Sequence, residues 1–353
     1  MFDRFNTSTN FNWNIQLLNN FFNYFTIDQT WQYWSVTQPL DIRPLLDPEI
    51  AALLAASPVD IGGVLASLTN ESIVEIRAMF AATPAPPLSD TIERTDHVLV
   101  DRGTAALRVH RPKNLVGQRP CVYWMHGGGL VLGDNKMDDG RFDSWCNEYG
   151  IVGVSADYRL APEHPYPTPL EDCYAGLAWV HENAESLGVD ATRIGVGGAS
   201  AGAGLAAGLA LLARDRGDLP IAFQLLIYPM IDDRQITVSS TWSDPIWSPA
   251  ANTFGWTAYL GNKKGTSDVE PYAAPARATD LSGLPPTLIS VGALDGFSDE
   301  DIDYAVRLRH AGVAVELHVY PGAPHGFDTF GDFTAISRRA VAETNSWLQG
   351  QIS

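Results

Sequence analysis

The chain has 353 residues, 45% of them hydrophobic and 18% charged, so it carries enough apolar material for a large core. Its net charge of -18 opposes binding to nucleic acid and to anionic membranes. No apolar run approaches the ~20 residues of a membrane span, and the first residues lack the basic and apolar regions of a signal peptide. We therefore expect a soluble, cytoplasmic protein of the size of an α/β enzyme with an insertion.

The first 40 residues differ from the rest of the chain in being rich in asparagine and aromatic side chains. Apolar residues from Leu17 to Phe25 recur with helical spacing, which predicts an amphipathic helix. Its polar face has no Lys or Arg, which argues against a helix lying on a membrane. Two further helices are expected within residues 47–82, followed by a linker at 83–90.

From about residue 92, apolar runs of strand length alternate with helical stretches, which predicts a mostly parallel sheet with helices on both faces. The first two strands form a hairpin. The expected strands are 96–101, 106–112, 121–127, 150–158, 193–198, 222–230, 286–292 and 313–322, and the expected helices are 170–188, 200–217, 299–312 and the tail from 334. The alternation stops between Asp232 and Pro285, a stretch rich in aromatic residues and proline, which we interpret as an insertion. We expect residues 1–40 to pack on this insertion.

The glycine-rich run at 195–204 contains Gly198-Ala199-Ser200-Ala201-Gly202, a G-x-S-x-G pattern between an expected strand and an expected helix. That context is typical of a nucleophile elbow, where a strained turn presents a serine. A dinucleotide loop fits less well because Gly202 and Gly204 fall inside the helix, and a phosphate-binding P-loop would need a lysine. Glycines that merely allow close packing are the remaining alternative.

Companion residues favour the elbow. His126 and the three glycines Gly127, Gly128 and Gly129 follow an expected strand directly, and glycines let a loop backbone approach an oxyanion closely. Taken alone, the three glycines would also fit an ordinary tight loop. Together with a nucleophile elbow in the same chain, they favour a loop that binds an oxyanion. We expect His126 itself to brace this loop by hydrogen bonds.

A reactive serine needs a base and a group that orients the base. Of eight histidines, His325 lies just after the last strand between Gly and Pro residues, and Asp295 ends the strand before it. The order Ser200, Asp295, His325 is that of α/β-hydrolases. We interpret the neighbouring acidic run as N-terminal charges of the next helix, with Ser298 as its cap; the run is Asp299, Glu300, Asp301 and Asp303. The other histidines are assigned to strands, surface helices or a proline-rich loop: His97, His110, His164, His181, His310 and His318.

Metal and redox chemistry find little support in the sequence. "HENAE" at 181–185 lacks the second histidine of a zinc motif, and the acidic run lacks the glycine and spacing of a calcium loop. The three cysteines, Cys121, Cys146 and Cys173, show no metal spacing and are expected to be buried thiols, although a disulfide between two of them stays open. We expect no cofactor and no metal.

From about residue 85 to its end, the chain resembles the hormone-sensitive-lipase-like carboxylesterases, also called bacterial family IV. The motifs that carry the resemblance are "HGGG" (126–129), "DYRLAPEHPYPTPLED" (157–172), "GGASAGAGLA" (197–206), "ALDGFSDE" (293–300) and "HGF" (325–327). The resemblance implies an α/β-hydrolase fold in which Ser200 is the nucleophile, His325 the base and Asp295 its partner.

The same resemblance implies further roles. The N–H groups of Gly128, Gly129 and Ala201 would form the oxyanion hole, and a helical cap would cover the site. The resulting division is 1–60 for the N-terminal part of the cap, 61–231 for the first part of the core, 232–285 for the cap insertion and 286–353 for the second part of the core. We expect a structural brace from Asp157, Arg159, Glu163 and Asp172.

The sequence thus predicts a serine carboxylesterase that hydrolyses short- to medium-chain esters, with a small ester as its partner and a homodimer as the form the resemblance suggests. A lipase, an amidase or a lactonase with the same triad is the alternative within this chemistry. A ligand receptor on an inactive hydrolase fold is disfavoured because receptors that resemble this family lack the histidine present here at 325.

Overall fold

The computed structural model describes residues 40–82, 87–99 and 106–353. The helix expected from Leu17 to Phe25 lies outside these ranges, and so does the packing expected of residues 1–40 except at Leu40. Within the described ranges, no helix combines the length and the apolar character that crossing a bilayer requires.

Eight strands of the described chain form one sheet in the order β1-β2-β4-β3-β5-β6-β7-β8. Their bounds are β1 Ile92–Val98, β2 Ala106–Pro112, β3 Arg119–Met125, β4 Val152–Asp157, β5 Val189–Ala199, β6 Gln224–Ile227, β7 Thr287–Gly292 and β8 Val315–Tyr320. β2 pairs antiparallel with both β1 and β4, and every other pairing in this sheet is parallel. The predicted hairpin and the mostly parallel sheet are confirmed.

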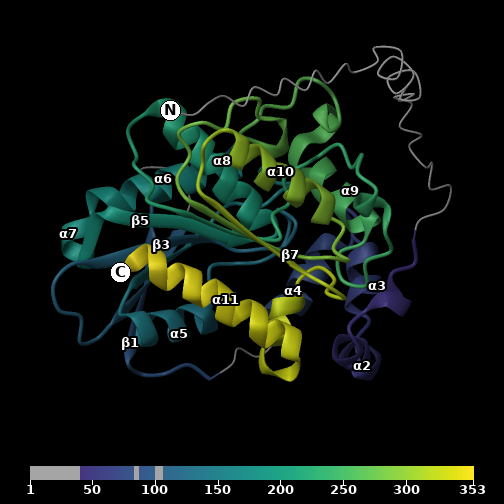
Figure 1. Cartoon of the computed structure of the whole chain (residues 1–353), viewed down its shortest axis with the longest axis horizontal. Helices are drawn as coiled ribbons and strands as arrows, with labels where there is room; N and C mark the ends of the chain where they lie inside the picture. Colours follow the sequence, from purple (N-terminus) through teal and green to yellow (C-terminus); the bar gives the residue numbers. More distant parts are fainter. Residues whose placement is uncertain (1–39, 83–86, 100–105) are drawn as a thin grey trace, which may run out of the picture. The chain divides into compact units, whose positions relative to one another are not determined.

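Helices cover both faces of the sheet (Figure 1). One face carries α6 (Thr168–Glu182), α8 (Ala201–Arg216) and α10 (Ser298–His310), and the opposite face carries α5 (Asp139–Tyr149) and α11 (Ala335–Ile352). α8 is buried along most of its length because alanine, glycine and leucine surround its axis on every side. α6 is followed by the single turn α7 (Ala184–Leu187).

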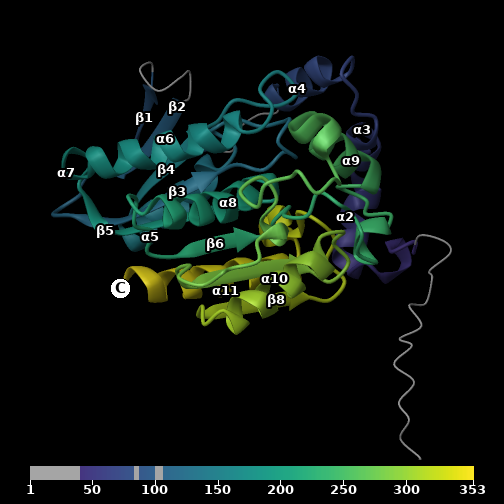
Figure 2. The same cartoon turned by 90° about the horizontal axis from the view of Figure 1, so that it is seen from above.

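A second group of helices gathers near the carboxyl ends of the parallel strands. It comprises α2 (Pro48–Ala56), α3 (Ile61–Ala66), α4 (Ile73–Ala81) and, from the insertion, α9 (Pro249–Leu260). Figure 2 shows α2, α3 and α9 together at one end of the sheet. A Cβ atom built on Gly62 of α3 would lie 2.1 Å from the carbonyl oxygen of Pro245, so α3 packs tightly on the insertion. The domain boundaries at 60/61, 231/232 and 285/286 remain predictions.

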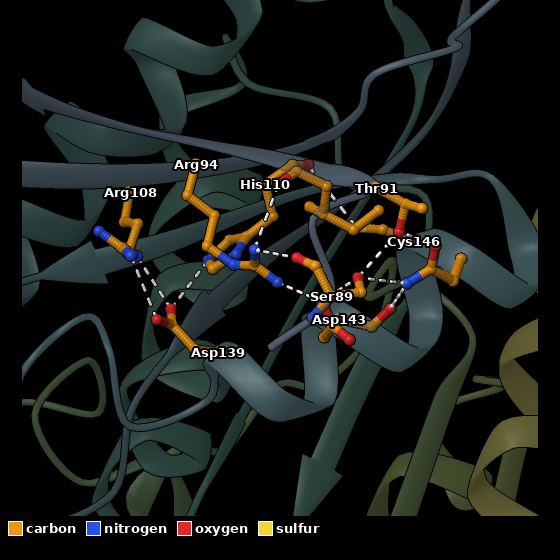
Figure 3. Close-up of polar contacts among 10 residues, drawn as sticks. Ser89, Thr91, Arg94, Arg108, His110, Asp139, Asp143 and Cys146 are labelled. Atoms are coloured by element: carbon orange, nitrogen blue, oxygen red, sulfur yellow. Dashed lines mark hydrogen bonds and ion pairs between the residues drawn. The ribbon is translucent and has the colours of Figure 1, made fainter. Parts of the chain in front are cut away.

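A polar cluster joins α5 to the first two strands (Figure 3). Arg108 donates to both oxygens of Asp139 (2.9 and 3.2 Å), while Arg94 pairs with Asp143. His110 is fully buried beside them, with its Nε2 atom 3.7 Å from Asp139 Oδ1. Burial, with the charges of Arg108 and Arg94, lowers the pKa of His110 to about 3. The histidine is therefore neutral within this ionic cluster.

Candidate active site

Ser200 occupies the sharp turn between β5 and α8. Its backbone has φ 57° and ψ −121°, a conformation that a non-glycine residue adopts only under constraint. The constraint comes from both sides, because the Ser200 N–H donates to the Ile227 carbonyl (2.9 Å) and the Ser200 carbonyl accepts from Met230 N (3.1 Å). The turn thereby holds the serine in a fixed position.

The glycines around Ser200 are required by close packing. A Cβ atom on Gly198 would lie 2.3 Å from the carbonyl carbon of Gly202. One on Gly202 would lie 2.1 Å from the carbonyl oxygen of Met125 at the end of β3. The helix after the serine therefore runs against the backbone of the neighbouring strand at a distance that only glycine permits. This geometry is that of a nucleophile elbow.

Three residues that are far apart in the sequence meet at this turn. His325 Nε2 lies 2.9 Å from Ser200 Oγ, and His325 Nδ1 lies 2.8 Å from Asp295 Oδ2. Asp295 follows β7, and His325 follows β8. All three side chains are buried, and Asp295 Oδ1 also accepts the backbone N–H of Phe297 (2.9 Å). The carboxylate is thus held on both oxygens, and it orients the imidazole towards the serine.

The charge around His325 makes it a stronger base than an ordinary histidine. Burial lowers the pKa of His325, but the carboxylates of Asp295, Asp244 and Asp328 together outweigh burial, with Asp295 contributing most, so the pKa is raised. The rings of Tyr228 and Phe297 stand edge-on to the imidazole at centroid distances of 4.8 and 5.0 Å. These contacts restrict the motion of the ring.

The glycine loop after β3 lies beside the serine. A Cβ atom on Gly127 would lie 3.5 Å from Ser200 Cβ. The loop turns back at Gly128 (φ 114°) and Gly129 (φ 61°), and the Gly128 carbonyl accepts from the N–H groups of Val131 and Leu132. Within the described ranges, the N–H groups of Gly128, Gly129 and Ala201 donate to no protein acceptor. These donors are available to a developing oxyanion, and that of Ala201 lies at the N-terminus of α8.

His126 braces this loop as expected. Its Nδ1 atom lies 2.7 Å from the carbonyl oxygen of Gly127, and its ring stacks on Tyr158 with centroids 4.3 Å apart. The Tyr158 hydroxyl donates to the His126 carbonyl (2.7 Å). Burial lowers the pKa of His126, so the ring is a neutral structural group.

Two ion pairs hold the loop that follows β4. Arg159 binds both oxygens of Asp172 (2.7 and 2.8 Å), and Arg77 of α4 binds both oxygens of Glu163 (2.7 and 3.0 Å). Arg77 also donates to the carbonyl of Val131, so it ties α4 to the glycine loop as well. Arg159, Asp172 and Glu163 thus support neighbouring loops, as expected of a structural brace, and none of them contacts Ser200.

The acidic run after Asp295 does place charges at the N-terminus of the next helix, with Asp299, Glu300 and Asp301 in the first turn of α10, but the cap expected at Ser298 was wrong. Ser298 is the first residue of α10, whose N-cap is Phe297, and no side chain caps it. Glu300 and Asp301 are buried, and Glu300 Oε1 accepts the N–H groups of Ile231 and Asp232 (both 3.1 Å). Asp299 Oδ2 accepts the N–H of Ser239 in the insertion (2.8 Å). Glu300 and Asp299 therefore bind the insertion to the core, a role that a position in the first turn of a helix does not indicate.

Two residues of the insertion lie at the site and were missed by the sequence analysis. The Trp247 indole occupies the position that a Cβ atom of Gly129 would take, and its ring centroid is 6.5 Å from that of His325. Asp244 is buried and accepts the backbone N–H of His325 (2.8 Å). The aromatic content of the insertion hinted at the first residue, but no pattern pointed to the second. A small hollow beside them is lined by Trp242, Trp247, Asn252 and Phe297.

Comparison with known proteins places these features in context. A family model for the alpha/beta hydrolase fold matches residues 122–329, a range that contains Ser200, Asp295 and His325. The Mycobacterium tuberculosis esterase LipI is 34% identical over 303 residues, 83% of this chain and 91% of that protein. The carboxylic ester hydrolase LipN of the same organism is 36% identical over 321 residues, 87% of this chain and 84% of that protein. The solved structure of a bacterial heroin esterase matches with a TM-score of 0.79 and 39% identity, covering 88% of this chain and 99% of that one.

Proposed function

Because the chain belongs to the hormone-sensitive-lipase-like carboxylesterases of the α/β-hydrolase fold, we propose that Ser200, His325 and Asp295 are the residues that carry out its reaction. The chain is a carboxylic ester hydrolase, and its fold implies a serine acyl-enzyme intermediate. The observation that carries the assignment is the continuous hydrogen-bonded line from Asp295 through His325 to Ser200.

The mechanism follows from that line. Ser200 Oγ adds to the ester carbonyl carbon while His325 Nε2 takes its proton, and Asp295 stabilises the imidazolium that forms. The carbon–oxygen bond to the alcohol then breaks, and His325 gives its proton to the leaving alkoxide. A water molecule attacks the acyl-enzyme in the same way and releases the acid. The N–H groups of Gly128, Gly129 and Ala201 stabilise the oxyanion of each tetrahedral intermediate.

The surroundings of the serine favour short- to medium-chain acyl groups. Trp247 covers Gly129, and Phe297 stands edge-on to His325. Both of these rings line the small hollow beside the site. α9 packs directly on the glycine loop, since a Cβ atom on Gly255 would lie 2.6 Å from the Gly129 carbonyl oxygen. Large rings close to the reacting carbonyl limit the room for a long chain. Hydrolysis rates across p-nitrophenyl esters from acetate to laurate test this, and a maximum at laurate contradicts it.

The alternatives within the same chemistry are distinguished by substrate. A lipase would show a rate that jumps above the solubility limit of its ester, whereas an esterase follows saturation in dissolved substrate. An amidase or a lactonase would cleave the amide or the cyclic ester at a rate comparable with that of the open-chain ester.

Labelling by a fluorophosphonate tests the triad itself. The wild-type enzyme is expected to be labelled at Ser200 in a one-to-one ratio, while Ser200→Ala is expected to be neither labelled nor active. His325→Ala and Asp295→Asn are expected to lower kcat by about three orders of magnitude or more with little change in thermal unfolding, because triad members act as a unit. Asp299→Asn is the matched control, and a larger loss there than in Asp295→Asn would disprove the assignment.

We propose in addition that the enzyme acts on small-molecule esters in the cytoplasm and does not bind nucleic acid. The net charge of -18 disfavours polyanions, and the three cysteines are free and buried, which fits a reducing compartment such as the cytoplasm. A homodimer belongs to the same proposal, and light scattering of the purified protein tests it.

A further inference from the structure

Asp244 binds two separate segments through one buried carboxylate. It lies in the insertion between the short helix η2 (Ser239–Thr241) and α9, and it is 4% exposed. Oδ1 accepts the N–H groups of Ile246 (2.7 Å) and Trp247 (3.0 Å), which folds the insertion into a tight turn. Oδ2 accepts the backbone N–H of His325 (2.8 Å). The carboxylate therefore bonds the insertion to the loop that follows β8.

Each of these segments carries a group that faces the reacting atoms. The loop after β8 carries the His325 imidazole, whose backbone position sets how its Nε2 atom meets Ser200 Oγ. The turn of the insertion carries the Trp247 indole, which covers Gly129. The Trp247 ring is also held by its Nε1–H, which donates to Asn252 Oδ1 (3.3 Å). A displacement at Asp244 would therefore move the base and the wall of the acyl site relative to each other.

We infer that Asp244 is a positioning residue that holds the catalytic histidine loop and the Trp247 wall in a single arrangement, an inference that rests on the proposed role of His325 as the base. Asp244 touches neither Ser200 nor the ester. It acts through two backbone segments, and a charged acceptor is suited to this because bonds to ionised groups are stronger than neutral ones.

The charge of Asp244 also affects the pKa of His325, an effect that a purely structural residue would not have. The groups that face this carboxylate are Asp295 of the loop after β7 and His325, while Asp328 acts on His325 from the short helix η5 (Phe327–Phe333). Burial and, after it, the charge of Asp295 raise the pKa of Asp244 to about 6, against the opposing effects of His325 and of the backbone N–H groups that the carboxylate accepts. Above that pH the ionised carboxylate helps to stabilise protonated His325. Removing the charge is therefore expected to lower the pKa of His325.

The test compares Asp244→Asn with Asp299→Asn in the full-length enzyme. Asp299 is the matched control because it also accepts a backbone N–H of the insertion, that of Ser239, but does not contact His325. The asparagine at 244 presents an acceptor to one segment and an amide donor to the other. We expect kcat to fall about tenfold or more, the acid limb of kcat/KM to move to lower pH, and the acetate-to-laurate preference to change. The control is expected to stay within about twofold of wild type, with an unchanged acid limb.

A second variant keeps the test decisive if Asp244→Asn does not fold. Asp244→Glu retains the charge and the acceptors but displaces them by one methylene. It is expected to keep the wild-type acid limb while losing kcat. An Asp244→Asn enzyme with wild-type kcat, acid limb and acyl preference would overturn the inference, and so would a fully active Asp244→Glu enzyme if only that variant folds.

Failure of this inference is distinguishable from failure of the proposed function. The fluorophosphonate label reports Ser200 independently of Asp244. If wild type is labelled at Ser200 and Asp244→Asn behaves as wild type, only the positioning role is wrong. If Ser200→Ala keeps its esterase activity, the triad assignment itself is wrong.

Discussion

Ser200 shows how a single residue depends on its backbone. Its φ of 57° is maintained by hydrogen bonds to Ile227 and Met230, while Gly198 and Gly202 remove the atoms that would clash. The side chain then needs no adjustment to meet His325 Nε2 at 2.9 Å. The G-x-S-x-G pattern, together with the glycine loop at 127–129 and His325, predicted this turn, because its glycines are required by close packing within one short stretch of chain. Asp244 was not predictable, since its partner at His325 is 81 residues away and any aspartate in a loop looks alike in sequence.

The pH dependence of the reaction belongs to the residue scale. His325 must be neutral to accept the serine proton, and its pKa is raised above 6.5 because Asp295, together with Asp244 and Asp328, outweighs the effect of burial. With chemistry limiting, kcat/KM is therefore expected to rise with pH through a limb centred above 6.5 and then to level off. A profile measured with p-nitrophenyl acetate tests this. A profile that stays flat down to about pH 4 is incompatible with a histidine base.

At the scale of elements, periodicity predicted most of the core. The predicted strands all overlap strands of the sheet within the described ranges, and α8 ends at Gly217 in a left-handed conformation as the sequence indicated. α5 was missed, although Phe142, Trp145 and Cys146 line one buried face of it, because its many polar residues concealed the helix. Residues 47–82 form three short helices rather than the two expected. Each is only six to nine residues long and shows little amphipathic pattern, so periodicity could not separate them.

The junction of β3 with α8 provides a test at this scale. In an ordinary helix interior, replacing glycine by alanine stabilises a protein by about 0.5–1 kcal/mol. Gly202→Ala is expected to do the opposite, because its Cβ would lie 2.1 Å from the Met125 carbonyl oxygen and 2.4 Å from that of His126. We expect a loss of about 2 kcal/mol or more in the free energy of unfolding, with a fall in kcat as the elbow shifts.

Gly350→Ala is the matched control for this variant. Gly350 lies in α11, and nothing is within 4 Å of the Cβ position. Urea unfolding of the two variants is expected to show opposite signs relative to wild type, or no change for Gly350→Ala. Equal stability of the two variants would mean that the contact between α8 and β3 tolerates an added methyl group.

For the molecule as a whole, the sequence named three residues that the structure brings into contact, Ser200, His325 and Asp295, but it did not name the contacts that attach the insertion. The triad residues meet because strand ends of a parallel sheet share one edge, a property that topology alone predicts. The carboxylates that attach the insertion, Asp244, Asp299 and Glu300, depend on tertiary contacts with backbone N–H groups and leave no periodic signal. The buried cluster at α5 depends likewise on pairing between elements that are distant in the sequence.

That cluster makes the stability of the whole fold sensitive to acid. The folded pKa of His110 is about 3, whereas an unfolded histidine has a pKa of about 6.5. Between these values the unfolded chain binds a proton that the folded chain does not, so the free energy of unfolding falls as pH falls. His110→Gln cannot titrate, so from pH 7.5 to pH 5 it is expected to lose about 2 kcal/mol less than wild type does.

Urea unfolding at the two pH values measures this difference. Substitution of the exposed His164 by glutamine is the control, and it is expected to follow wild type at both values. A wild-type pH slope in the His110→Gln protein would show that His110 binds its proton equally well in the folded and unfolded states.

The insertion joins the core between β6 and β7, and therefore after the strand that leads to Ser200, which is β5, and before the strand that leads to Asp295, which is β7. The residues of the proposed triad therefore lie outside the insertion, whereas Trp247, which covers Gly129, lies within it. On the proposed roles, replacing the insertion by a different segment would change which esters are accepted and would leave the triad in place. On the inferred role of Asp244, any replacement segment would need to supply another acceptor for the backbone N–H of His325, which now donates to Asp244.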